Sequence, residues 1–357
     1  MSQTPKFTTV TPSFHTELKN RINAYFQETG KTMSGNFKLW SKAIILVTIC
    51  MALYIHLVFF DHIVWIALVE CALLGCVVSA IGFNIMHDGS HGSFSNNPTL
   101  NKVAAVTLSI LGGNHFMWNM KHNVIHHAYT NIDGVDDDID AGILLRMAST
   151  QKKYKFHKYQ HIYVWGLYCI LYIYWIFGSD YKKYFKGRIG EIPLKKMSAA
   201  DHIYFWMYKI LHLTVFFIIP FIFVGILPTI VGFLTMTMVA GFVLSVVFQL
   251  AHTVEHTSMP MPDEETGKIS DEWAIHQLKT TANFATSNRF ISWYVGGLNF
   301  QVEHHLFPKI SHIHYPAISK IVKQACKEYK VTYIEYPKMW QAFRSHIAYL
   351  KLMGSIA

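Results

Sequence analysis

Long apolar runs alternate with polar segments along this chain, and they give the first expectation for its fold. Four runs reach the roughly 20 residues that a helix needs to cross a bilayer. Very short polar connections join the first two runs and the last two, so the four form two hairpins. We expect the spans at about residues 41–60, 63–84, 203–227 and 229–251. The pattern therefore predicts an all-α integral membrane protein with four transmembrane helices.

Two further apolar segments are shorter, and we expect them at the membrane interface. Asn101–Gly112 is brief, and Ile162–Gly178 is rich in Tyr and Trp, which favour headgroup depth. If Ile162–Gly178 were instead a fifth span, the polar clusters on its two sides would face opposite sides of the membrane. We expect residues 1–40 to form a polar, mobile N-terminal cytoplasmic arm, and residues 41–357 to form a single membrane domain.

Composition and charge agree with a lipid environment. Hydrophobic residues make up 52% of the 357 residues and charged residues only 15%, against about 25% in a soluble domain. The net charge is +9, and the two hairpin tips carry no Lys or Arg. By the positive-inside rule the tips face away from the cytoplasm. Since the basic residues flank the spans, we do not expect nucleic acid as a partner.

Histidines carry the candidate chemistry, because they gather in four clusters beside the apolar runs. Residues at positions i and i+4 share one face of a helix, so two imidazoles spaced in this way can point at one metal ion. Ionisable groups at membrane depth are costly and mark function by default. We predict a His-rich di-metal cap on the cytoplasmic face, with the candidate ligands His87, His91, His122, His126, His127, His252, His256, Gln301, His304 and His305.

Other polar residues receive plainer interpretations. We expect His122 and His126 to face one ion and His127, turned by about 100°, to reach a second. Asp88, Glu255 and Glu303 lie within the clusters and are expected to accept hydrogen bonds from the His rings. The Asp-rich run 133–140 lacks EF-hand spacing and is either a solvated loop or a support for the preceding cluster. Isolated histidines such as His56 and His62 are expected to be hydrogen-bonded core residues.

The order H-x-x-x-H, H-x-x-x-H-H, Q-x-x-H-H resembles the three histidine boxes of the integral-membrane fatty acid desaturases. Leu298–Pro308 is similar to the third box of front-end and bacterial linoleoyl-CoA-type members, and the resemblance covers Ile81 to Lys330. It implies two Fe ions held by the box histidines, with His252 as a further ligand. His256 departs from the pattern, since relatives often carry an acid there.

The resemblance also implies an activity: O2-dependent insertion of a cis double bond into a fatty acyl-CoA or acyl-lipid. This chain shows no fused b-type cytochrome motif, so we expect a separate electron donor, a ferredoxin or a b-type cytochrome. The expected location is a bacterial inner membrane, or the endoplasmic reticulum in a eukaryote.

Three rival functions remain open at this stage. The first is a di-iron fatty acid hydroxylase or alkane monooxygenase on the same scaffold, which shares the oxidant and differs in its product. The second is a zinc hydrolase, which needs fewer histidines and an open metal position beside a general base. The third is a metal or proton transporter, which needs polar groups through the whole depth of the bilayer.

Overall fold

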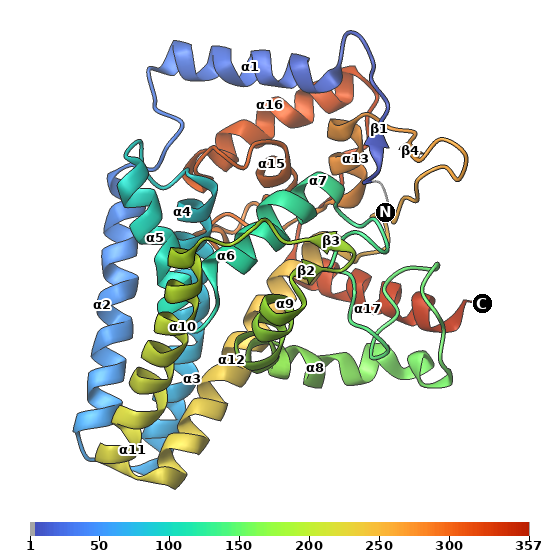
Figure 1. Ribbon diagram of the computed structural model, residues 1–357. Coiled ribbons are helices and arrows are strands. Elements are labelled where there is room, and N and C mark those ends of the chain that lie inside the picture. The colour runs from blue at the N-terminus through green and yellow to red at the C-terminus, as the bar shows by residue number, and fades with distance from the viewer. Residues whose placement is uncertain (1–3, 357) are drawn as a thin grey trace.

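Apolar helices run side by side through one half of the molecule, and shorter helices cap them (Figure 1). The computed structural model describes residues 4–356. Two of the long helices continue through a π-helical turn, η1 (Gly82–Met86) or η5 (Thr214–Ile218), into α4 or α11. The bounds are α2 (Phe37–Phe59), α3 (Val64–Ile81), α4 (His87–His91), α10 (Ala199–Leu213), α11 (Ile219–Val224) and α12 (Ile226–His252).

The four predicted spans are confirmed as helices long and apolar enough to cross a membrane. The break between the last two lies at Gly225, slightly before the predicted connection. Gly225 has φ +83°, a conformation that glycine adopts without strain. Pro228 falls in the first turn of α12, where the missing N–H has no helical partner to lose.

A fifth helical segment, Lys155–Lys186, also meets the length and apolarity of a span within residues 4–356, so the expectation of only four such segments is corrected. It consists of η3 (Lys155–Tyr159), α8 (Gln160–Tyr174), η4 (Trp175–Ser179) and α9 (Asp180–Lys186). Figure 1 shows α8 running crosswise to α2 and α3. The α8 backbone touches α12 at Gly241, where a Cβ would lie 2.7 Å from the Cys169 carbonyl oxygen.

The cap contains the segments that carry the His122–His127 and Gln301–His305 motifs. Its helical elements are α5 (Pro98–Ile110), α6 (His115–Trp118), η2 (Asn119–His126), α7 (His127–Tyr129), α13 (Trp273–Thr280), α14 (Arg289–Tyr294), α15 (Gln301–Leu306), η6 (His312–His314), α16 (Tyr315–Glu328) and α17 (Met339–Ser355). The β-structure consists of two-residue strands: β1 (Lys6–Phe7) pairs with β4 (Lys268–Ile269), β2 (Arg188–Ile189) with β3 (Ile192–Pro193), and β5 (Asn283–Phe284) with β6 (Glu335–Tyr336).

The N-terminal segment is a packed part of the cap, contrary to the expectation of a mobile arm. Helix α1 (Phe14–Thr29) buries Phe14, Leu18, Ile22 and Phe26 in one core cluster together with residues of α13, α15 and α16. Their spacing of four places all of them on one face of the helix. This four-residue spacing of apolar side chains is present in the sequence. The polar residues between them lower the mean hydropathy of the segment, so a hydropathy analysis does not detect the helix.

A buried ion pair ties α10 to α9. Lys209 Nζ lies 2.9 Å from Asp180 Oδ2 and also donates to the carbonyl oxygens of Gly112 and Ile176. Both side chains are almost wholly buried. Asp180 also accepts from Trp175 Nε1. Removal of the lysine therefore leaves a carboxylate in an environment where it has lost its countercharge.

We predict that Lys209→Ala destabilises the protein by about 3–5 kcal/mol, the usual cost of breaking a buried ion pair from one side. Thermal unfolding of the detergent-solubilised protein measures this. The control is Lys279→Ala, which breaks an exposed pair with Asp271 and is expected to cost less than about 1 kcal/mol. Equal shifts of the two melting temperatures would contradict the prediction.

Candidate metal centre

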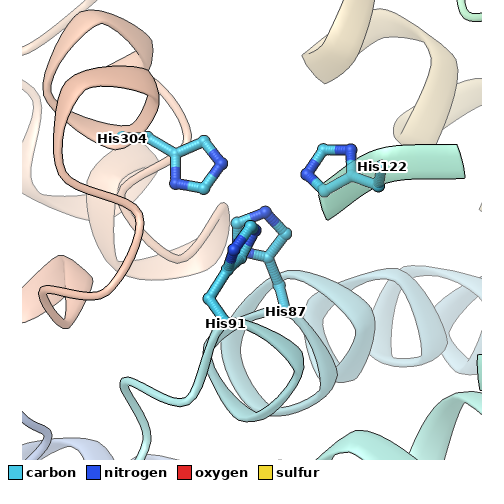
Figure 2. A group of neighbouring side chains, drawn as sticks. All are labelled: His87, His91, His122 and His304. Carbon is cyan, nitrogen blue, oxygen red and sulfur yellow. The ribbon is translucent and has the colours of Figure 1, made fainter. Parts of the chain in front are cut away.

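Three segments far apart in the sequence bring four imidazoles together at the capped end of the spans. Figure 2 shows His87 and His91 of α4 facing His122 of η2 and His304 of α15. One ring nitrogen of each lies within 4.8 Å of the others. Burial of His87, His122 and His304 is nearly complete, and His91 is half-buried. This first group has the size and donor type of a single metal site.

A second group lies next to the first. The nitrogens of His126, His252 and His305 also fall within 4.8 Å of one another. His127 forms a further such set with His304 and His305, and its ring stacks on that of His305 at 4.4 Å between centroids. Since His304 and His305 are consecutive in α15, one short helix supplies a side chain to each group. The arrangement therefore has places for two ions side by side.

A π-helix presents the second histidine motif. Segment η2 has i→i+5 hydrogen bonds, a rare geometry that is frequent at functional sites. His122 joins the first group and His126 the second, although both also lie close to Asp138 in a further set. Ordinary helical spacing leads us to expect that these two rings bind one ion. The geometry permits that arrangement, and it also permits His122 to bind one ion and His126 the other.

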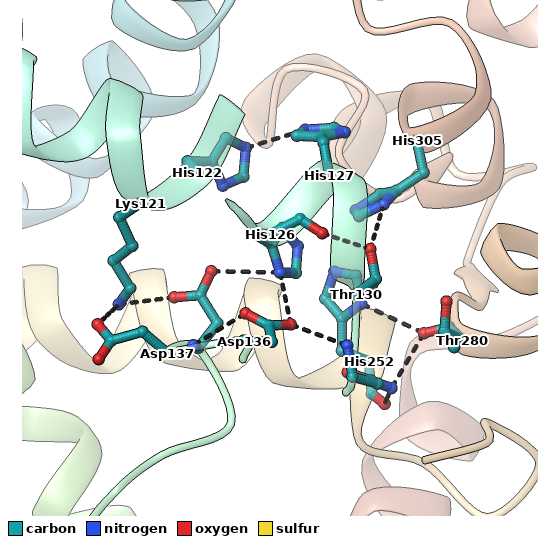
Figure 3. A network of polar contacts seen from close by, with 12 residues as sticks. Lys121, His122, His126, His127, Thr130, Asp136, Asp137, His252, Thr280 and His305 are labelled. Carbon is teal, nitrogen blue, oxygen red and sulfur yellow. Dashed lines mark hydrogen bonds and ion pairs between the residues drawn. The ribbon is translucent and has the colours of Figure 1, made fainter. Parts of the chain in front are cut away.

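Four rings, those of His126, His252, His304 and His305, are oriented by a bond to the Nδ1 atom, and Figure 3 draws the partners Asp136 and Thr280. Asp136 Oδ2 lies 2.9 Å from His126 Nδ1, and Gln277 Oε1 lies 2.8 Å from His305 Nδ1. The Tyr315 hydroxyl lies 3.1 Å from His304 Nδ1, and the Thr280 carbonyl oxygen lies 3.3 Å from His252 Nδ1. A bond at Nδ1 fixes the ring plane and leaves Nε2 of His126, His304 and His305 for a metal, whereas Nε2 of His252 lies against the Gln301 amide.

The free nitrogens fit a metal site. Buried polar atoms almost always have a hydrogen-bond partner. Nevertheless, six ring nitrogens of the cluster find no such partner among the described residues: Nε2 of His87, His91, His126, His304 and His305, and Nδ1 of His127. Burial lowers the pKa of His122, His127, His304 and His305 well below the usual value for histidine. These rings are therefore neutral near pH 7, the form that binds a metal.

Carboxylates are concentrated beside the second group. Burial alone would lower the pKa of His126, but attraction to Asp136 and Asp138 raises it. Asp138 in turn pairs with Lys121 at 2.7 Å, and Asp137 pairs with Lys183 at 3.0 Å. Of the two roles considered for the Asp-rich run, support of the preceding cluster is the one that Asp136 performs. Negative charge here offsets part of the charge of cations held by neutral ligands.

The acids within the motifs have other partners than expected. Asp88 lies 3.0 Å from His312 Nδ1, and the opposite nitrogen of His312 lies 3.0 Å from Lys42 Nζ. Glu303 accepts from Asn283 and Tyr333, and burial raises its pKa to about 7. Glu255 is exposed. The expectation that these acids orient cluster histidines is therefore wrong, because their neighbours in the fold come from distant segments.

Two of the candidate ligands take different positions. Helix α12 ends at His252, so His256 does not share a helix face with it. His256 is exposed and stacks on Tyr336 at 6.2 Å. Gln301 is buried, and its amide nitrogen lies 3.0 Å from His252 Nε2. It thus reaches the second group through His252.

Sequence reasoning missed Gln277, Tyr315 and Thr130, which contact cluster histidines. Thr130 Oγ1 lies 3.2 Å from His305 Nδ1 and 3.0 Å from Gln277 Oε1. None of the three belongs to a recognisable motif. Tyr315 lies ten residues after His305, but nothing in its local sequence indicates a contact with His304.

A cavity of about 730 Å³ lies beside the second group, with His122, His126 and His252 in its wall. Lys182, Lys186 and Arg188 also line it. A smaller, mostly apolar cavity of about 30 Å³ is bounded by His87 and Gly82. The two cavities share the wall residues Trp118, Tyr172, Trp175, Leu244 and Phe248. The two cavities therefore adjoin one another across these residues, beside the histidine groups.

Comparisons with known proteins agree with this site. The sequence profile of the family "Fatty acid desaturase" matches residues 63–337. The chain is 36% identical over 342 residues to an sn-1 linoleoyl-lipid 6-desaturase of Synechocystis sp., covering 96% of this chain and 95% of the relative. It is 37% identical to the enzyme of the same name from Arthrospira platensis, covering 96% and 92%. An acyl-lipid (8-3)-desaturase of Physcomitrium patens is 34% identical, covering 96% and 72%.

We predict that Asp136→Asn lowers the metal affinity of the purified protein by about 10–100-fold, the usual effect of losing a group that orients a ligand. Metal retained against a competing chelator measures this. Asp137→Asn is the matched control, because Asp137 pairs with Lys121 and Lys183. If the two variants retained metal equally, Asp136 would not be orienting His126.

Proposed function

Because the chain belongs to the fatty acid desaturase family, we propose that it is a front-end acyl-lipid desaturase that uses O2 and two Fe ions. The protein is an oxidoreductase that desaturates fatty acyl chains, as its family and its relatives indicate. The observation that carries the proposal is the pair of histidine groups with unpartnered nitrogens, beside a cavity of about 730 Å³ whose wall includes His122, His126 and His252.

The proposed ligands are the histidines of the two groups. His87, His91, His122 and His304 would hold one ion, and His126, His252 and His305 the other, with His127 between them. We leave His256 out, and we place Gln301 at the second site itself, since its amide lies against the His252 nitrogen that does not bond Thr280. Bound there, iron supplies the oxidant that removes hydrogen from an unactivated methylene, which no side chain can deprotonate.

The overall reaction removes one hydrogen from each of two neighbouring methylenes, forms a cis C=C bond and reduces O2 to two molecules of water. Two electrons and two protons are needed in addition. The electrons come from a separate donor, for which we propose a ferredoxin or a b-type cytochrome. The contribution of this chain is to hold the acyl chain against the cluster and to keep the site apolar.

The relatives favour an acyl-lipid over an acyl-CoA as the substrate. The two cyanobacterial relatives are named linoleoyl-lipid 6-desaturases. The wall of the larger cavity carries charges of both signs, among them Lys182, Lys186, Asp140 and Glu191, and these can contact a polar lipid head. We propose that the double bond forms near the carboxyl end of the chain, as the names of these relatives describe for them.

We also propose that four segments cross the membrane and that Lys155–Lys186 lies at the interface. The ends of α4 and α12 meet in one cluster, which requires an even number of crossings between them. Helices α10–α11 and α12 provide two. The crosswise course of α8 (Figure 1) and its Tyr and Trp residues support an interfacial position. The basic residues near the cluster favour the cytoplasmic face for the active site.

The first test is fatty acid analysis by gas chromatography–mass spectrometry of cells that express the chain. We predict a new unsaturated fatty acid that is lighter than its precursor by two hydrogens. The double variant His304→Ala/His305→Ala is expected to lose this product, because it removes one proposed ligand from each histidine group. His202→Gln, at an exposed site that bonds Tyr184, is the control and should retain the product. A hydroxylated product would move the assignment to the monooxygenase alternative.

Gly82 provides a test of how the acyl chain lies. It borders the smaller cavity, and a Cβ there would meet only Leu244, at 3.9 Å. If the methyl end occupies this cavity, Gly82→Leu excludes about two methylenes. Each methylene that can no longer be buried costs about 0.8 kcal/mol. We therefore predict that the preference of the enzyme for a substrate over its analogue two carbons shorter falls roughly tenfold in this variant.

The matched control for this test is Gly166→Leu, at an exposed position of α8 with no atom within 4 Å of the added Cβ. Products from a mixed substrate pool should be unchanged in this variant. An unchanged chain-length preference in Gly82→Leu, with activity retained, would place the methyl end elsewhere.

A further inference from the structure

A second cluster of metal-binding side chains lies at the tip of the first hairpin. It consists of His56 in the last turn of α2, His62 in the connection, and Glu70 in α3. One candidate ligand atom of each lies within 4.8 Å of the others. Figure 1 shows this tip at the end of α2 and α3 that lies away from α4 and α15. From Glu70 to His87 the helix rises about 25 Å, so this cluster is separate from the histidine groups described above.

The contacts within the cluster are specific. His56 Nδ1 lies 2.9 Å from Glu70 Oε2, and His62 Nε2 lies 2.8 Å from the His56 carbonyl oxygen. The two rings lie 4.7 Å apart, edge to face. The side chain of His56 is 48% exposed, whereas that of Glu70 is only 17% exposed. The expectation that His56 and His62 are core histidines is therefore wrong: they converge at the surface on a carboxylate.

Glu70 is the feature that calls for an explanation. It is the seventh residue of α3, in a segment otherwise apolar from Val64 to Ile81. A carboxylate about 9 Å along a spanning helix is costly unless it has a partner, and such residues mark functional sites by default. A histidine hydrogen bond offsets part of this cost. A cation shared by the carboxylate and the two imidazoles offsets more of it, because the charge is then neutralised by direct bonds.

We propose that His56, His62 and Glu70 form a binding site for a divalent cation of the Zn2+ class. Two imidazoles and one carboxylate are a common set of three protein ligands for Zn2+, with a water as the fourth. His62 has Nδ1 available, since its Nε2 bonds the carbonyl oxygen. The ion would bridge α2 and α3 at their connection and stabilise the hairpin. Its exposed position makes it accessible from the side of the membrane opposite the active site.

The test is a zinc titration of the detergent-purified, iron-loaded protein, with Zn and Fe per chain measured by mass spectrometry. We expect one additional Zn2+ per chain without loss of iron, and a rise in melting temperature on binding. Glu70→Gln keeps a hydrogen-bonding side chain of the same shape and is expected to weaken zinc binding by at least about tenfold, as is His56→Gln. His202→Gln is the control and should bind zinc like the unchanged protein.

Retained desaturase activity in Glu70→Gln and His56→Gln confirms that the variants are folded and separates this site from the catalytic one. The proposal is overturned if the unchanged protein takes up no more zinc than Glu70→Gln. It is also overturned if the added zinc replaces iron one for one, because the ion is then in the histidine groups of the active site.

Discussion

Imidazole has two ring nitrogens, and the architecture of this protein follows from what each of them requires. A nitrogen that binds a metal has to be neutral and free, so the other nitrogen has to be held to fix the ring. Asp136, Gln277, Tyr315 and the Thr280 carbonyl perform this second task. They come from the loop after α7 and from helices α13 and α16. The cap therefore has to enclose the cluster from several directions, and its many short helices provide this enclosure.

The four long apolar helices and the clustering of the histidines were predictable from the sequence, whereas the partition of the histidines into two groups was not. Apolar length alone identifies α2, α3, α10–α11 and α12, and the four-residue spacings identify the box histidines. The partition of His122 and His126 depends on the π-helical form of η2, which no spacing rule reveals. The partners of Asp88 and Glu303 depend on contacts between segments far apart in the chain. Helix α1 was underestimated because its apolar residues are separated by charged ones.

The two histidine groups differ in their electrostatic surroundings. Asp136 and Asp138 lie against His126 in the second group. The carboxylate nearest in sequence to the first group, Asp88, is directed to His312 and thereby to Lys42. Equal ions in the two sites would thus experience unequal fields, with the more negative environment around the second. The large cavity borders this second group and therefore adjoins the more negative of the two.

The position of α15 also has a consequence for biosynthesis. His304 and His305 belong one to each group, and both follow the last spanning helix in the chain. A nascent polypeptide emerging from the ribosome thus completes its membrane insertion while both groups still lack a histidine. The α1 helix, made first, obtains its packing partner α16 only at the end of translation. An unfinished chain therefore lacks part of both histidine groups until α15 has been made, when all the spanning helices are already complete.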